Sequence, residues 1–178
     1  VAPFETSFGR ETDRQCIIIT LQAEGLTGYG ECVASREPGY NYETTGTAMH
    51  ILKDFIAPLI LGKDIQDARD FQTRVESIRG HHLAKAGVEM ALWDLLGRRD
   101  GRSLREMFGG RRETVEVGVS IGIQESASAL VRTVAAYLDN GYRRVKIKIK
   151  PGREVDETSA VRRAYPDLRL QVDANSAY

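Results

Sequence analysis

Apolar and polar residues alternate along two segments near the C-terminal end of the chain, residues 143–150 and 168–173. In the first segment lysines alternate with valine and isoleucine, and in the second polar residues alternate with leucine and valine up to Asp173. Because successive strand side chains point to opposite faces, each segment predicts a strand with one apolar and one polar face. Residues 154–165 can form one helix between them, which predicts a β-α-β unit with parallel strands.

The same arrangement occurs earlier in the chain. Residues 115–121 alternate valine or isoleucine with polar or small residues, and Ser120 is the last position of the polar face. Apolar positions between residues 127 and 138 then predict an amphipathic helix that ends near Gly141. Three strands with helices between them indicate the start of a (β/α) barrel.

Lys146, Lys148 and Lys150 share the polar face of the second of these three predicted strands. Taken alone, such a stripe is typical of a solvated strand edge. A strand between two helices is normally interior to a parallel sheet, so its polar face is expected to point into the barrel. Functional groups of such barrels gather at the C-terminal ends of the strands, which makes Lys148 and Asp173 candidates for chemistry.

The first part of the chain has a different pattern. Segments 15–23 and 26–33 flank a Glu24-Gly25 turn and predict a β-hairpin. Three helices are expected after it, from apolar stripes at Met49, Leu52, Phe55, Ile56 and Leu59, at Phe71, Val75 and Ile78, and at Ala84, Val88, Ala91, Leu92, Leu95 and Leu96. The third helix should stop near Asp100-Gly101.

A capping box at Ser103 and Glu106 predicts one more short helical turn before the chain changes character. Strands followed by helices indicate an α+β module. We therefore predict an α/β protein with an α+β domain over residues 1–110, followed by the first three βα segments of a TIM-type (β/α) barrel over residues 111–178.

The composition excludes some function classes. The chain has 178 residues, of which 42% are hydrophobic, and its 25 basic and 25 acidic side chains give a formal net charge of zero. This balance provides no electrostatic attraction to nucleic acid or to an anionic membrane. The sequence shows neither an apolar stretch of membrane-spanning length nor a signal-peptide core, so we expect a cytoplasmic protein. Cys16 and Cys32 lie roughly opposite on the hairpin, where a disulfide is conceivable, but two buried reduced thiols are expected.

Length sets a further limit. A complete barrel of this kind takes about 250 residues. The residues after about position 112 supply three of its eight strands, and the chain begins at Val1 rather than at methionine. We therefore expect a portion of a longer protein, without a short N-terminal strand and the larger part of the barrel.

Six motifs in collinear order, which cover essentially the whole chain, resemble those of one protein family. They are A-P-F-E-T-S-F-G (residues 2–9), G-E-C (30–32), R-G-H-H-L-A-K-A-G-V-E-M-A-L-W-D (79–94), V-G-V-S-I-G-I (117–123), K-I-K-I-K-P-G (146–152) and V-D-A-N-S-A-Y (172–178). On these motifs the chain resembles the enolase superfamily, and within it the o-succinylbenzoate synthase and N-succinyl- or N-acylamino acid racemase group. The resemblance implies that residues 1–110 form the capping domain of that superfamily.

The resemblance also implies a chemistry. Family members abstract a proton next to a carboxylate and form an enediolate that a divalent cation, usually Mg²⁺ or else Mn²⁺, stabilises. Two outcomes share this step: dehydration to o-succinylbenzoate in menaquinone synthesis, and racemisation of N-acylated amino acids. Lys148 matches the acid/base residue, and Lys146 matches a lysine near the substrate carboxylate. Asp173 matches the first of three acidic metal ligands, whereas the other two and a second lysine belong to later barrel strands.

Four residues are weaker candidates for substrate contact. Ser120 matches a family position near the substrate, although a hydroxyl at a strand end can equally satisfy a neighbouring backbone group. Phe4 and Tyr40 fall on two N-terminal loops that close over the barrel mouth in this family, and the alternative is that they anchor these loops. Asn175 can orient substrate or a ligand, or it can bond its own backbone as loop residues do.

Other functions remain open on the sequence. Dipeptide epimerases and muconate-type cycloisomerases share the lysine and aspartate chemistry, and a non-catalytic chain could keep the capping module for binding or assembly. The resemblance does not divide synthase from racemase. For an enzyme we expect a small-molecule carboxylate substrate, no nucleic-acid or membrane partner, and a homo-oligomer at full length. We expect residues 1–178 alone to be inactive, because one acidic ligand leaves a Mg²⁺ site incomplete.

Overall fold

The computed structural model describes residues 3–178, and these form two compact units. One unit is Arg14–Arg112, and the other combines the described residues up to Asp13 with Glu113–Tyr178. The predicted division after residue 110 placed the N-terminal residues with the first unit. They pack with the second unit instead, because their backbone bonds to it: the Ile123 N–H donates to the Glu5 carbonyl oxygen at 2.9 Å.

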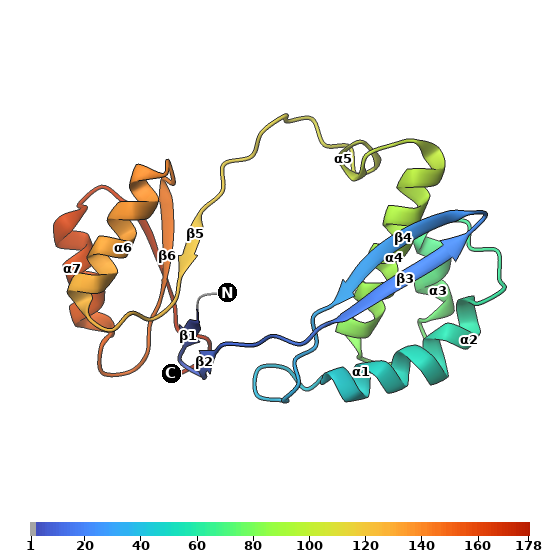
Figure 1. Ribbon diagram of the computed structural model, residues 1–178, viewed down its shortest axis with the longest axis horizontal. Helices are drawn as coiled ribbons and strands as arrows, with labels where there is room; N and C mark the ends of the chain where they lie inside the picture. The colour runs from blue at the N-terminus through green and yellow to red at the C-terminus, as the bar shows by residue number, and fades with distance from the viewer. Residues whose placement is uncertain (1–2) are drawn as a thin grey trace. The chain divides into compact units, whose positions relative to one another are not determined.

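A β-hairpin packed on a long helix forms the centre of the first unit (Figure 1). Strands β3 (Ile17–Ala23) and β4 (Leu26–Cys32) pair in antiparallel fashion, as predicted. The two residues between them, Glu24 and Gly25, have φ angles of 51° and 79°. Positive φ at both central positions matches the right-handed twist of the flanking strands, so this short turn sets the register of the hairpin.

Helix α4 (His82–Asp100) lies directly against β4. A Cβ added to Gly30 would come within 2.0 Å of the Gly87 carbonyl oxygen, so the strand and the helix can approach this closely only with glycine at that position. The helix ends at Gly101, whose φ is 61°, as the sequence predicted. The predicted stripe of α4 is buried at Ala84, Val88, Ala91, Leu92 and Leu96.

A second helical segment is interrupted by a π-helical turn. Helix α1 (Thr45–Ile51) continues into η1 (Leu52–Ile56) and then into α2 (Ala57–Ile60). The Ala57 N–H donates to the Leu52 carbonyl, five residues back. The proline that follows Ala57 has no N–H for the regular ladder, which favours such a local rearrangement.

The π turn changes which face of this segment is buried. Of the predicted stripe, Met49 and Phe55 are 50% and 49% exposed, so the prediction is wrong at these positions. Ile56 of the stripe is buried as predicted, and Ala48 and Ile51, which lie outside the stripe, are buried as well. A turn with a wider hydrogen-bond spacing rotates the residues after it relative to those before it, and a stripe drawn with regular α-helical spacing then fails.

Two shorter helices complete the first unit. Helix α3 (Ala68–Arg74) buries Phe71 from the predicted stripe. Helix α5 (Leu104–Met107) begins at the predicted capping box, in which Ser103 and Glu106 each bond the backbone of the other.

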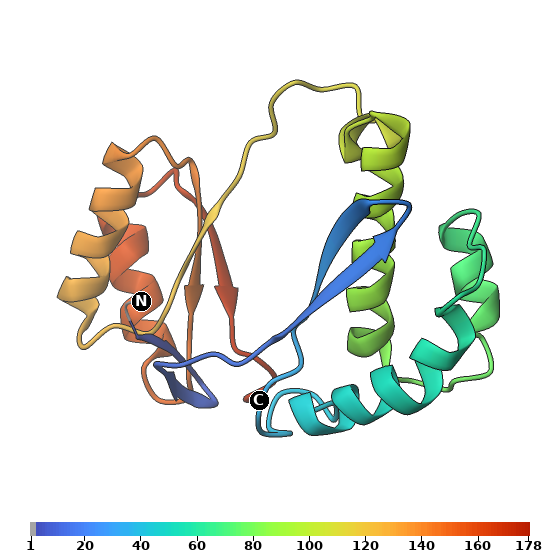
Figure 2. The same cartoon turned by 45° about the vertical axis from the view of Figure 1, so that its right-hand side comes forward.

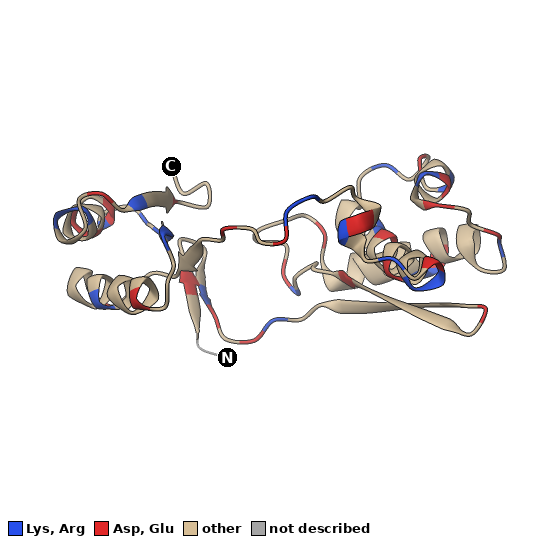
Figure 3. Cartoon of the chain, turned by 90° about the horizontal axis from the view of Figure 1, so that it is seen from above, with Lys and Arg blue, Asp and Glu red and all other residues tan. Residues whose placement is uncertain are grey.

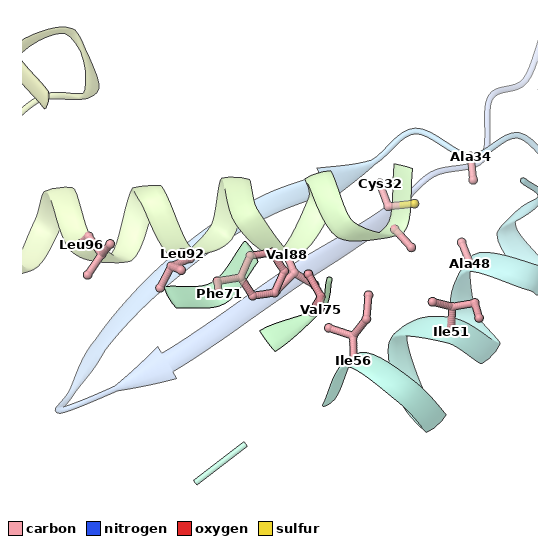
Figure 4. Close-up of a cluster of buried hydrophobic side chains, with 11 residues drawn as sticks. Cys32, Ala34, Ala48, Ile51, Ile56, Phe71, Val75, Val88, Leu92 and Leu96 are labelled. Atoms are coloured by element: carbon pink, nitrogen blue, oxygen red, sulfur yellow. The ribbon is translucent and has the colours of Figure 1, made fainter. Parts of the chain in front are cut away.

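Side chains from the hairpin and from the helices meet in one hydrophobic cluster, shown in Figure 4. Its buried members are Cys32, Ala34, Ala48, Ile51, Ile56, Phe71, Val75, Ala84, Val88, Leu92 and Leu96. Because the members come from β4 and from α1, η1, α3 and α4, and β3 packs against them through Ile17, Ile19 and Leu21, this cluster is the core of the unit.

The second unit is built on a parallel sheet of order β5-β6-β7. The strands are β5 (Val119–Ile121), β6 (Arg144–Lys148) and β7 (Arg169–Asp173), and helices α6 (Ala127–Asp139) and α7 (Glu154–Ala164) connect them. Both helices lie on the same side of the sheet (Figures 1 and 2). They pack on its apolar face in a cluster of Ile121, Leu130, Val134, Val145, Ile147, Ile149 and Val161. The predicted α+β module followed by parallel βα units is therefore confirmed.

Strand β5 is shorter than the sequence predicted. Only Val119–Ile121 pairs with β6, and the pairing starts opposite Val145. Residues 115–118 therefore have no strand to pair with, and Val115 and Val117 are 72% and 61% exposed. The prediction of a strand over these four residues is wrong, because alternation alone cannot show where the neighbouring strand begins.

A short hairpin of β1 (Phe4–Thr6) and β2 (Gly9–Glu11) also belongs to the second unit. Basic and acidic residues are interspersed along the helices of each unit (Figure 3). In residues 3–178 we find no helix that is both long and apolar enough to cross a bilayer. Cys16 and Cys32 are free thiols, but Cys16 is exposed, so the prediction of two buried thiols is wrong for Cys16.

Candidate active site

Lys148 and Asp173 are the last residues of the neighbouring strands β6 and β7, and they lie opposite each other in the parallel register. The Lys148 Nζ donates to the Asp173 Oδ2 at 2.9 Å. Parallel strands end at the same edge of a sheet, so two residues that are 25 positions apart in the chain meet there. The structure thus brings together the pair that the sequence singled out.

Lys146 completes a triangle with this pair. Its Nζ lies 3.0 Å from the same Oδ2 of Asp173. The Lys148 side chain is 9% exposed, whereas those of Lys146 and Asp173 are 33% and 24% exposed. The hydrogen bond from Lys148, and then that from Lys146, hold the pKa of Asp173 well below its usual range. The carboxylate is therefore ionised at neutral pH.

Asn175 contacts both members of the central pair. Its backbone N–H donates to the Asp173 Oδ1 at 3.0 Å, and its side-chain Oδ1 accepts from the Lys148 Nζ at 2.6 Å. Asn175 and Ser176 have φ angles of 49° and 61°, and this left-handed backbone turns the chain back toward the strand end. The Lys148 ammonium is consequently held between a carboxylate and an amide oxygen.

Ser120 lies on the neighbouring strand β5, where it is paired with Lys146 in the register. Residues paired in this way point to the same face of a sheet, so Ser120 belongs to the face that carries the lysines. It is exposed. Its contact with substrate stays a prediction.

Phe4 is the first residue of β1 and lies next to Gly122, which directly follows β5. It is 37% exposed, and its Cδ2 is 3.2 Å from the position that a Cβ on Gly122 would occupy. Tyr40 lies in the other unit, on the loop between β4 and α1, and is 74% exposed. The structure therefore places Phe4 in the same unit as the lysines, and substrate contact by either aromatic residue stays a prediction.

One contact at the strand ends was missed by the sequence analysis. The Lys150 Nζ donates to the Glu5 Oε1 at 2.9 Å, across 145 positions of the chain. Lys150 was noted only as a member of the lysine stripe, and Glu5 was given no role. No local pattern signals such a pair, because nothing in the periodicity of either segment refers to the other.

The oxygen atoms of this cluster fit part of a Mg²⁺ site. Mg²⁺ prefers hard oxygen ligands, and the ionised Asp173 and the amide oxygen of Asn175 are of that type. In the structure the positive groups at these oxygens are the ammonium groups of Lys146 and Lys148. Within residues 3–178 there is no group of three or more His, Cys, Asp or Glu that could hold a metal ion. Asp173 and Asn175 therefore fit part of the ligand set of a cation site rather than a complete set.

Comparison with known proteins gives consistent matches. Residues 1–109 match the family described as the mandelate racemase / muconate lactonizing enzyme, N-terminal domain. The chain is 43% identical over 178 residues to an o-succinylbenzoate synthase from Geobacillus kaustophilus, a match that covers 99% of this chain and 48% of that protein. It is 45% identical over 175 residues to an N-succinylamino acid racemase from Thermus thermophilus, with 98% and 47% covered.

A solved structure agrees with these matches. The crystal structure of an enolase superfamily member from Listeria innocua aligns with a TM-score of 0.92 at 41% identity, over 100% of this chain and 48% of that chain. The chain thus spans about half the length of the curated relatives that it matches.

Proposed function

This chain belongs to the mandelate racemase / muconate lactonizing enzyme family of the enolase superfamily, and from this we propose that its natural protein abstracts a proton next to a carboxylate. We propose that it acts as an o-succinylbenzoate synthase, an N-succinylamino acid racemase, or both, because relatives with these names match the whole chain. The observation that carries the proposal is the 2.9 Å contact between Lys148 and Asp173. It supports the proposal because the reaction requires a base and a carboxylate that binds a cation, and neighbouring Lys148 and Asp173 can serve as these two groups.

Lys148 is the base in this proposal. Its Nζ is fixed by Asp173 and Asn175 at 2.9 and 2.6 Å, and the low exposure of the side chain restricts other positions. A lysine removes a proton only in its neutral form, so Lys148 must first release the proton that its ammonium donates to these oxygens. A base with one fixed position favours removal of a single, defined proton.

Lys146 has an electrostatic role. Its side chain is more exposed than that of Lys148 and lies on the same face of the sheet. An ammonium in this place can attract the carboxylate of a substrate and hold it beside the base. This role needs no proton transfer from Lys146.

The proposed cofactor is Mg²⁺ or Mn²⁺, with Asp173 as one ligand. The cation would supply positive charge that stabilises the negative charge formed as the substrate proton leaves. Asp173 is ionised in advance and needs no proton loss to serve as a ligand. One carboxylate does not complete an octahedral oxygen site, so a polypeptide of residues 1–178 alone is expected to show no turnover.

Phe4, Tyr40, Ser120 and Asn175 are the proposed substrate-binding residues. Support for Asn175 comes from its contact with Lys148, and support for Ser120 comes from its place on the lysine face. The substrate is a small carboxylate, and the enzyme is a cytoplasmic homo-oligomer in this proposal. Dipeptide epimerases and muconate-type cycloisomerases are the alternatives within the enzyme class.

An assay of the natural protein with Mg²⁺ tests this function. The protein is incubated in deuterated water with the dehydration substrate of o-succinylbenzoate synthesis and, separately, with N-succinylamino acids. Product formation and α-proton exchange are followed by NMR. We expect dehydration, racemisation or both, with exchange at the α-carbon of the N-succinylamino acid. Absence of product and of exchange on both substrate classes contradicts the proposal, and exchange on dipeptides alone supports the epimerase instead.

A further inference from the structure

The hairpin β1–β2 is tied to the C-terminal end of every strand of the β5-β6-β7 sheet. After β5, the Ile123 N–H donates to the Glu5 carbonyl oxygen at 2.9 Å. After β7, the Ser7 hydroxyl donates to the Ala174 carbonyl oxygen at 2.6 Å. After β6, the Lys150 Nζ donates to the Glu5 Oε1 at 2.9 Å. The hairpin therefore lies at the edge of the sheet at which Lys148 and Asp173 meet.

These three contacts are of two kinds. In the contacts to β5 and β7 the acceptor is a backbone carbonyl oxygen, whereas the contact to β6 is an ion pair between two side chains. The side chains of Lys150 and Glu5 are 35% and 31% exposed, so the pair is partly shielded from water. Lys150, with further positive charge from Arg10 and Arg153, lowers the pKa of Glu5, which keeps this carboxylate charged.

The three lysines of the stripe, two in β6 and one just after it, therefore contact two different carboxylates. Lys146 and Lys148 contact Asp173, and Lys150 contacts Glu5. The ion pair between Glu5 and Lys150 adds no group to the proton-transfer site. It anchors β1, the strand in which Phe4 precedes Glu5.

We propose that Glu5 and Lys150 are positioning residues, whose ion pair holds the hairpin and Phe4 at the rim of the Lys148–Asp173 site. The pair then determines how well substrate binds, and it leaves the proton transfer by Lys148 unchanged. This inference rests on the proposed function, because it assigns Phe4 to the substrate side of the same site. The physical reason is that two ties along β5 and β7 leave the hairpin free to tilt away from β6, and the third tie removes that freedom.

Reversing the charges tests the inference in the natural protein. Glu5→Lys or Lys150→Glu alone places two like charges together, and each should raise KM about tenfold while kcat stays within about threefold of the parent. The double variant E5K/K150E restores opposite charges in exchanged positions. It should return KM to within about threefold of the parent, a rescue that a general loss of folding would not show.

Hydrogen exchange followed by mass spectrometry gives a readout that needs no substrate. Amides of residues 4–11 and of Ile123 should exchange faster in each single variant and return to the parent rate in the double variant. The matched control is the exposed pair Glu116–Arg169, at 3.8 Å in the same unit. The same charge reversals there should change neither KM nor exchange in the hairpin.

The outcomes separate this inference from the proposed function. Unchanged KM in both single variants, or a folded double variant that restores neither KM nor exchange, overturns the positioning role. If the natural protein turns over neither substrate class, the proposed function fails and hydrogen exchange decides alone. In that case faster exchange that the double variant reverses supports the tie, and unchanged exchange overturns it.

Discussion

Each unit of the chain fixes one carboxylate with hydrogen-bond donors, and the two units use different kinds of donor: Glu43 in the first unit and Asp173 in the second. In the first unit Glu43 is 1% exposed, and its two oxygens accept the backbone N–H groups of Leu83 and Ala84 at 2.9 and 3.1 Å. These amides belong to the first turn of α4, where the backbone has no partners of its own within the helix. Glu43 thus closes the N-terminus of the longest helix of its unit.

In the second unit the Asp173 Oδ2 accepts from the ammonium groups of Lys148 and Lys146, and only its Oδ1 accepts a backbone N–H, that of Asn175. A backbone N–H is part of the helix and neither leaves nor gives up its proton during a reaction. An ammonium can do both, and it can also be replaced at the carboxylate by another cation. The ammonium donors, together with the greater exposure of Asp173, distinguish this candidate for chemistry from the structural acid Glu43.

The sharpest test of this contrast is Lys148→Ala in the natural protein. The loss of a positioned base should lower the rate of product formation about a hundred-fold to ten-thousand-fold. The free energy of unfolding, measured in urea, should stay close to that of the parent, because Lys146 remains as a partner of Asp173. Lys63→Ala, at an exposed lysine of the first unit, is the control and should keep the parent rate. A Lys148→Ala variant that forms product at the parent rate would move the base elsewhere.

A smaller effect is expected for Asp173→Asn. The amide keeps the size and one oxygen of the side chain but removes the charge that attracts a cation. We expect the Mg²⁺ concentration for half-maximal rate to rise about tenfold to a hundred-fold, while the protein still folds. Titration of Mg²⁺ against activity measures this, with Asp167→Asn before β7 as the exposed control. If the variant and the parent need the same Mg²⁺ concentration, Asp173 is not a ligand.

The smallest effect is expected for Glu43→Gln, and it should be on stability alone. The amide keeps one oxygen for the α4 amides and presents an NH₂ to the other, so one N–H loses its partner. We expect the free energy of unfolding to fall by about 1–2 kcal/mol, measured by urea denaturation, with no change in the Mg²⁺ requirement. Glu37→Gln, at an exposed loop position, should leave stability unchanged. An altered Mg²⁺ requirement in Glu43→Gln would contradict the purely structural role of Glu43.

Several features could be predicted from the sequence because they depend on residues close together in the chain. Alternation in β6 showed that Val145 and Ile147 would be buried and that Lys146 and Lys148 would share the opposite face. The capping box of α5 likewise involves positions three apart. One helix between two parallel strands also brought Lys148 and Asp173 to the same edge, so the central pair of the candidate site was accessible to sequence reasoning.

Other features were decided only by the tertiary structure. The exposure of Met49 and Phe55 depends on a π turn and on the surface that this helical segment faces, neither of which its periodicity contains. The length of β5 depends on where β6 begins. In both cases the periodicity of the segment contains no information about the element that packs against it, and that element decides the outcome.

The same limit applies to the site. The sequence alone determined which residues are charged, which of them share a strand face and at which end of a strand they lie, because side-chain alternation is a property of the backbone. It did not determine that Asn175 would hold the Lys148 ammonium, or that Glu5 would pair with Lys150 across 145 positions. A contact between distant segments follows from how whole elements pack, and only the folded chain makes that choice.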